Sequence, residues 1–163
     1  MALTGEGTWF EDYPVGRRMR HVRGATVGEF ENQMLTKLVM NTAQSHWNEH
    51  SMERSPWGKR LVFGLVTGSM VIGLTQQDCC ENAIRTLGLD KMRFTAPVFH
   101  GDTIYAFSEV VESSPAPDRD DAGIVRFRHW GTKHGLDIKG HRVDGQVVFE
   151  GEQIALIRRR PVS

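Results

Sequence analysis

The stretch that decides the fold is Gly64-Leu-Val-Thr-Gly-Ser-Met-Val-Ile-Gly-Leu74. Every residue in it is apolar or small, so a helix formed by it has no strongly polar face on any side. Glycine costs a helix roughly 1 kcal/mol relative to alanine, so its repeated use here indicates close backbone packing. We expect a helix that begins at Gly64, is enclosed on every side and ends near Gly88.

A shorter helix is expected before it, over residues 27–40. Apolar residues recur there at steps of three and four, which is typical of a helix with one buried stripe. Thr26 and Glu29 have the spacing of a capping box at its start. The stripe consists of Val27, Phe30, Met34, Leu38 and Val39.

The remaining elements are expected to be strands, because β-forming residues alternate with polar ones between loop signals. The hydrophilic segment 133–144 is expected to be a turn. Few strands alternate with helices, which favours an antiparallel sheet in an α+β domain that wraps around the apolar helix and spans residues 1–163. The expected strands cover residues 18–23, 91–94, 102–113, 124–130 and 146–160.

Composition limits the classes of function. The 163 residues fit one domain, and 20 basic residues balance 20 acidic ones, so a nucleic-acid partner is not expected. The longest apolar stretch, 61–74, is too short to cross a bilayer, and the first residues do not read as a signal peptide. The only cysteines are the adjacent Cys79 and Cys80, which indicate reduced thiols in a cytoplasmic protein.

The candidate site lies just before the apolar helix. His46 precedes Gly64 by eighteen residues, and Asn41 precedes His46 by five. A histidine can move a proton near neutral pH, and the free N–H groups of a helix start can hold an oxyanion. Each residue also has a structural interpretation: His46 could make a loop hydrogen bond, Asn41 could cap the preceding helix, and Gly64 could serve packing alone.

Two segments together resemble a known family. In MaoC-like, (R)-specific enoyl-CoA hydratases, an Asp-x-Asn-Pro-x-His loop is followed by a glycine that starts the central helix. The matching positions here are Asn41, His46 and Gly64. The second segment, Met92-Arg-Phe-Thr-Ala-Pro97-Val-Phe-His-Gly101-Asp102-Thr-Ile, looks like the family's strand-turn-strand. The resemblance covers roughly residues 8–158.

This resemblance implies a hot-dog fold and reversible addition of water to an enoyl-CoA thioester. It implies His46 as the base, Asn41 as a residue that orients water, and Gly64 as the donor to the thioester oxygen. Phe63 and Leu65 are then expected to contact the substrate. Lys59 and Arg60 could bind CoA phosphates or a substrate carboxylate, or they could simply lie in a solvated loop. No metal or redox cofactor is expected, CoA enters as part of the substrate, and the protein is expected to be at least a homodimer with the acyl site near the subunit interface.

One departure from the family pattern bears on the substrate. Asn41 stands where the family has an aspartate, and Gln44 stands where proline is usual. Members that resemble mesaconyl-CoA and related C5-dicarboxylyl-CoA hydratases also carry asparagine there, which favours a branched or dicarboxylic acyl-CoA. The alternatives are a hot-dog acyl-CoA thioesterase, which often has a carboxylate on the central helix, and a non-catalytic acyl-CoA-binding protein.

The other histidines suggest no second site. His46 and His50 have a helical metal-ligand spacing, but no third ligand accompanies them, so no metal is expected. The remaining histidines after the apolar helix are expected to be surface or turn residues. They are His100, His129, His134 and His141.

Overall fold

A computed structural model describes residues 7–136 and 141–161. Its five strands form one antiparallel sheet in the order β1-β3-β4-β5-β2. The strands are β1 (Arg18–Thr26), β2 (Ala83–Phe94), β3 (Thr103–Pro115), β4 (Ala122–Leu136) and β5 (Arg142–Arg158). The helices are α1 (Glu29–Leu38), α2 (Glu49–Glu53) and α3 (Gly64–Cys79), and the 3₁₀ turns are η1 (Phe10–Asp12) and η2 (Gln44–His46).

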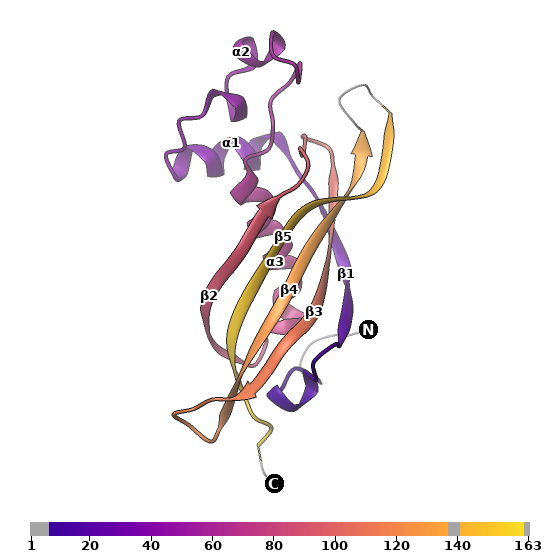
Figure 1. The fold of residues 1–163 in the computed structure, drawn as a ribbon. Helices are drawn as coiled ribbons and strands as arrows, with labels where there is room; N and C mark the ends of the chain where they lie inside the picture. The colour runs from indigo at the N-terminus through magenta and orange to yellow at the C-terminus, as the bar shows by residue number, and fades with distance from the viewer. Residues whose placement is uncertain (1–6, 137–140, 162–163) are drawn as a thin grey trace.

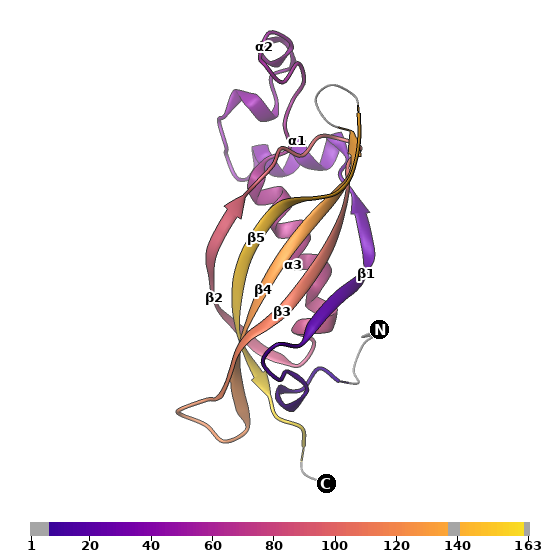
Figure 2. The ribbon, with the colours of Figure 1, turned by 45° about the vertical axis from the view of Figure 1, so that its right-hand side comes forward.

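The long helix α3 lies along the concave side of the curled sheet (Figures 1 and 2). Val66 and Val71 are buried in the core that α3 shares with the sheet. A Cβ atom added at Gly68 would come within 2.9 Å of the Phe149 ring on β5, so this glycine permits the close approach. The predicted α+β hot-dog architecture, with an antiparallel sheet around one long helix, is confirmed.

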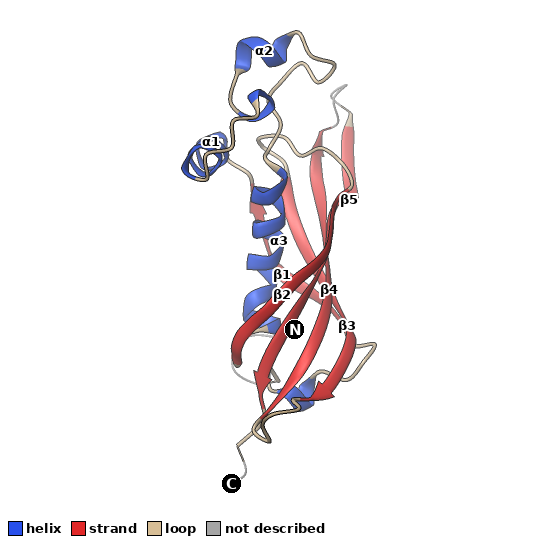
Figure 3. Ribbon diagram, turned by 60° about the vertical axis from the view of Figure 1, so that its left-hand side comes forward, coloured by secondary structure: helices blue, strands red, loops and turns tan. Residues whose placement is uncertain are grey.

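The prediction that α3 is enclosed on every side was wrong. Leu65 is 47% exposed, and Ser69 and Gly73, which follow on the same face, are exposed as well. The reason is visible edge-on: the one sheet covers α3 from one side, and no other element in the described chain covers its opposite side (Figure 3). This exposed α3 face consists of Leu65, Ser69 and Gly73.

The prediction that α3 continues toward Gly88 was also wrong. The helix ends at Cys79, and β2 begins at Ala83 and runs to Phe94, where only residues 91–94 had been expected as a strand. Strand β2 is an edge strand in which no side chain is fully buried. Its sequence therefore lacks the alternation that would have revealed it.

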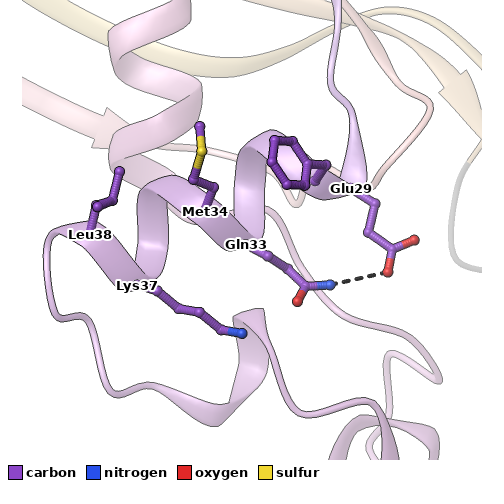
Figure 4. A pocket seen from close by; sticks show the side chains of 6 residues that line it. Glu29, Gln33, Met34, Lys37 and Leu38 are labelled. Carbon is purple, nitrogen blue, oxygen red and sulfur yellow. Dashed lines mark hydrogen bonds between the residues drawn. The ribbon is translucent and has the colours of Figure 1, made fainter.

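Helix α1 is turned opposite to the sequence prediction. Phe30 is 73% exposed and Leu38 is 70% exposed, whereas the buried residues of α1 are Asn32 and Thr36. Figure 4 shows the outward surface of α1, where Met34 and its neighbours line an open hollow of about 700 Å³. Only Val27 of the predicted stripe is buried, and it precedes the helix.

The predicted capping box is also absent. The N-cap of α1 is Gly28, and no side chain caps it. Thr26 is the last residue of β1, and its hydroxyl bonds that of Thr103 at 2.8 Å. Glu29 instead pairs with Arg60.

A buried network of polar side chains connects α3 to four strands of the sheet, namely β1, β3, β4 and β5. His21 contacts the Asp78 carboxylate through Nδ1 at 2.6 Å and the Ser108 hydroxyl through Nε2 at 2.7 Å. The same hydroxyl lies 2.7 Å from Nδ1 of His129, whose Nε2 lies 3.1 Å from Oε1 of Gln153. His129 is 1% exposed, so its predicted surface or turn position was wrong.

Because of this buried polar network, we predict that the stability of the fold falls in acid. Burial lowers the pKa of His129 from its ordinary value to about 4, and it also lowers the pKa of His21. Below about pH 6.5 the unfolded chain therefore binds protons that the folded chain excludes, and stability falls as the pH falls toward 4. His129 alone should lower the free energy of unfolding by about 2 kcal/mol between pH 7.5 and pH 5.

Urea unfolding at the two pH values measures this effect. His129→Gln should lose most of the part that His129 contributes, whereas the control His50→Gln, on the exposed side of α2, should keep the full difference. An unchanged pH dependence in His129→Gln would contradict the assignment.

Candidate active site

The loop that carries Asn41 and His46 is shaped by the end of α1. Met40 adopts a left-handed backbone conformation (φ 54°), and the Asn41 amide donates to the Thr36 carbonyl at 3.0 Å. Oδ1 of Asn41 then accepts from the Ala43 amide at 2.9 Å, which closes a small turn. Asn41 therefore ends the helix through its backbone and shapes the loop through its side chain.

His46 lies in η2 with a defined proton arrangement. Its Nδ1 is 3.1 Å from the Leu61 carbonyl, which can only accept, so Nδ1 carries the proton. In the neutral ring the basic nitrogen is then Nε2. The ring also packs against Phe63, with centroids 5.2 Å apart. A structural bond thus leaves the other ring nitrogen available for proton transfer.

The start of α3 supplies hydrogen-bond donors. Phe63 is the N-cap, and its carbonyl accepts from Val66 at 2.9 Å and from Thr67 at 3.1 Å. Among the residues that the structure describes, the amides of Gly64 and Leu65 have no acceptor. The positive end of the helix dipole adds to their attraction for a negatively charged oxygen.

His46 and Gly64 line the same cavity, whose volume is about 480 Å³. The start of α3 and the end of β2, which contribute lining residues, lie at the end of the sheet where α1 and α2 are found (Figure 1). The cavity lining is mostly apolar, with few polar groups, as is usual for a site that binds a small organic group. The other lining residues are Trp57, Leu61, Val62, Phe63, Leu65, Thr67, Phe94, Thr95, Ala96, Pro97 and Val148.

The structure therefore brings four of the predicted site residues together, namely His46, Phe63, Gly64 and Leu65. Asn41, Lys59 and Arg60 are not part of the cavity lining.

The two basic residues before the cavity differ in their surroundings. Arg60 is buried and forms ion pairs with Glu29 and with Glu49, the latter at 2.6 Å, so it links α1 to α2. The Arg60 guanidinium holds the pKa of Glu29 below its ordinary value. Lys59 is half-buried, with its ammonium nitrogen 4.1 Å from the centroid of the Phe99 ring.

Sequence reasoning missed part of the cavity wall. Phe94, Thr95, Ala96 and Pro97 close it from the end of β2. A Cβ atom at Gly64 would lie 3.1 Å from the Phe94 ring, so this wall stands directly against the helix start. The available signal was the 92–104 segment, which had been interpreted as the family's strand-turn-strand and not as part of the site.

The larger hollow on the outer surface of α1 is a weaker candidate. Its polar lining residues are Glu29, Gln33 and Lys37, and no histidine lines it. Among the described residues, no group of three or more histidine, cysteine or acidic side chains is arranged to hold a metal ion. The cavity at His46 is therefore the candidate active site.

Solved structures with the same architecture place this chain in the class of hot-dog-fold proteins. A MaoC domain protein from Chloroflexus aurantiacus superposes with a TM-score of 0.84 at 34% identity, over 96% of this chain and 46% of that one. A Mycobacterium tuberculosis protein described as having a double hot-dog fold superposes with a TM-score of 0.74 at 21% identity, over 96% of this chain and 46% of its own.

Sequence comparison narrows the class to a family. Residues 4–159 match the family model described as mesaconyl-CoA hydratase, and the chain belongs to this family. The β-methylmalyl-CoA dehydratase of Chloroflexus aurantiacus is 34% identical over 98% of this chain and 47% of its own length. This chain thus spans about half the length of that relative. The predicted MaoC-like resemblance, with its mesaconyl-CoA hydratase branch, is confirmed.

Proposed function

We propose that this chain acts as a hydratase or dehydratase that adds water reversibly across the double bond of an enoyl-CoA, with a branched or C5-dicarboxylic acyl group. The main observation in support is that a histidine with a basic Nε2 and the unpaired amides at the start of α3 line the same apolar cavity. Family membership and the named dehydratase relative support the substrate class.

In the proposed mechanism the thioester carbonyl oxygen accepts a hydrogen bond from the Gly64 amide. As water adds at Cβ, negative charge develops on that oxygen, and donors fixed in advance stabilise it more than the ground state. His46 removes a proton from water through Nε2, the hydroxide adds to Cβ, and the proton is returned to Cα. One base can serve both transfers on the same side of the double bond, and dehydration is the reverse.

Asn41 lies outside the cavity lining but shapes the loop that carries His46, and we propose that it orients the attacking water from the side of that loop. One lone pair of its Oδ1 is taken by the Ala43 amide, so the second lone pair and the side-chain NH₂ are available to the water. Phe63 and Leu65 would contact the acyl chain. Arg60 already pairs with two glutamates, so Lys59 is the better candidate for a phosphate or carboxylate of the substrate.

We further propose that the protein needs no metal or redox cofactor. We also propose that residues 1–163 form one domain and that the protein is located in the cytoplasm. Addition of water to a conjugated thioester needs only a base and an oxyanion donor, which supports the first point. No described helix is long and apolar enough to span a membrane. Cys79 and Cys80 are both free thiols.

The reaction type is tested with crotonyl-, mesaconyl- and itaconyl-CoA. We expect mass spectrometry to show a gain of one water on mesaconyl-CoA, faster than on crotonyl-CoA, without release of CoA. Free CoA detected with a thiol reagent would indicate a thioesterase instead. Tight binding without any product would indicate a binding protein. Either result would overturn the proposal.

The role of His46 is tested by His46→Gln, which removes the titrating group but retains a similar size. We expect kcat to fall at least ~100-fold, because general-base catalysis is lost, with the melting temperature nearly unchanged. His50→Gln is the matched control, because it lies four residues further along the chain and is exposed. Its kcat should equal that of the wild type. Comparable turnover in His46→Gln would exclude His46 as the base.

A homodimer is proposed as the working unit. The α3 face formed by Leu65, Ser69 and Gly73 is exposed, and so are Leu87 and Leu89 on edge strand β2. Both surfaces flank the cavity, because Leu65 and Phe94, at the end of β2, line it. Relatives about twice as long support a second copy in the place of their other half. We propose that β2 pairs with β2 of that copy.

Light scattering should therefore give twice the chain mass of 18.4 kDa. Leu89→Glu places a charge on the proposed interface and should shift the protein to monomer. Val22→Glu is the matched control on the opposite edge strand, where Val22 is 56% exposed, and should leave the dimer intact. A dimer that survives Leu89→Glu but dissociates with Val22→Glu would place the interface at β1.

A further inference from the structure

The buried side of α1 is polar where it faces the site. Asn32 is fully buried, with an exposed fraction of 0%, and Thr36 follows one turn later with the same exposure. The Thr36 hydroxyl donates to the Asn32 backbone carbonyl at 2.6 Å. A buried amide side chain in a helix needs partners. One contact of Asn32 is local, since its Oδ1 lies 3.5 Å from the Thr36 hydroxyl, and its other contacts are with segments distant along the chain.

The Asn32 side chain joins both halves of that site. Its Oδ1 accepts from the Phe63 amide at 2.9 Å, and Phe63 directly precedes Gly64. Its Nδ2 points toward the carbonyls of Leu61 at 3.4 Å and His46 at 3.5 Å. The Leu61 carbonyl is also the group that holds Nδ1 of His46. One amide therefore touches the helix start, the histidine loop and the carbonyl between them.

A third segment is held in the same way. Nδ2 of Asn32 lies 3.0 Å from Nε2 of His100, in the turn between β2 and β3. An amide nitrogen can only donate, so Nε2 of His100 accepts and the ring is neutral with its proton on Nδ1. Burial favours the same state, since it lowers the pKa of His100. The charged groups around this ring are Glu29, Glu49, Lys59 and Arg60.

We infer that Asn32 is a positioning residue that sets the distance and orientation between the His46 base and the Gly64 amide. This inference rests on the proposed function. Asparagine suits the place because its Oδ1 accepts while its NH₂ offers two N–H donors to the acceptors around it, whereas aspartate has no N–H to donate and leucine can neither accept nor donate. Both catalytic groups act in the transition state, so a small misplacement lowers kcat more than it weakens binding.

The first test is Asn32→Leu, with Thr36→Val as its matched control. Both remove a buried hydrogen-bonding group from the same face of α1, but only Asn32 contacts the site segments. We expect kcat to fall ~10- to 100-fold in Asn32→Leu with KM within about threefold of wild type. Thr36→Val should lower the melting temperature while kcat remains near the wild-type value. Equal losses of kcat in both variants would make Asn32 a merely structural residue.

The second test exchanges donor and acceptor. Asn32→Asp keeps the acceptor for the Phe63 amide but faces His100 with a second acceptor, so kcat should fall. Adding His100→Gln supplies a side-chain NH₂ at the position of Nε2, which can donate to the carboxylate and should restore part of the lost kcat. His100→Gln alone should not raise kcat. Absence of any recovery in the double variant would overturn the contact on which the inference depends.

A substrate-free measurement separates this inference from the proposed reaction. In ¹⁵N-histidine-labelled wild type, NMR should show His46 as the neutral tautomer protonated at Nδ1. In Asn32→Leu the ring should become a mixture of tautomers, and in Thr36→Val it should not. If wild type hydrates no enoyl-CoA, the proposed function fails while this measurement still decides whether Asn32 positions His46. An unchanged His46 spectrum in Asn32→Leu would overturn the positioning role.

Discussion

The structure depends on one constraint, which is that a single curled sheet must cover one long apolar helix. Close contact between α3 and the sheet needs small residues on the helix, and Gly68 faces the Phe149 ring where a Cβ atom would not fit without adjustment. Because the sheet holds α3 along its length, the helix start is left at the end of the sheet. Its amides open there into the cavity beside His46. The candidate oxyanion site is thus a consequence of the packing that stabilises the fold.

The same constraint explains why polar side chains are buried at the end of the sheet that holds the candidate active site. A chain that must pass from the histidine loop to the start of α3 carries backbone N–H and C=O groups that need partners. Asn32 provides several of them from α1, which turns the apolar side of that helix outward. The exposed faces of α1 and α3 show that one chain does not bury all of its own apolar surface. This agrees with relatives of about twice its length.

The sequence predicted the parts of the fold that rest on local chemistry. The start of α3, the antiparallel arrangement and the long strands β3 and β5 follow from composition and alternation, and the structure confirms them. The extent of α3 was wrong because β2 is an edge strand with little burial, so no alternation marks it. The orientation of α1 was wrong for a different reason: periodicity identifies an apolar face but does not say whether the chain itself covers it.

For the candidate site, the sequence by itself determined which residues are proposed to react and their order along the chain. It singled out His46 and Gly64 because acid–base chemistry and helix-start donors depend on residue type and on local structure. Only the tertiary structure decided that His46 and Gly64 line one cavity and that Arg60 is already paired. It also decided that Asn32 is buried and contacts the segments that carry His46 and Gly64. Those facts depend on contacts between segments distant in the chain. A periodic pattern in one segment cannot specify its partner in another.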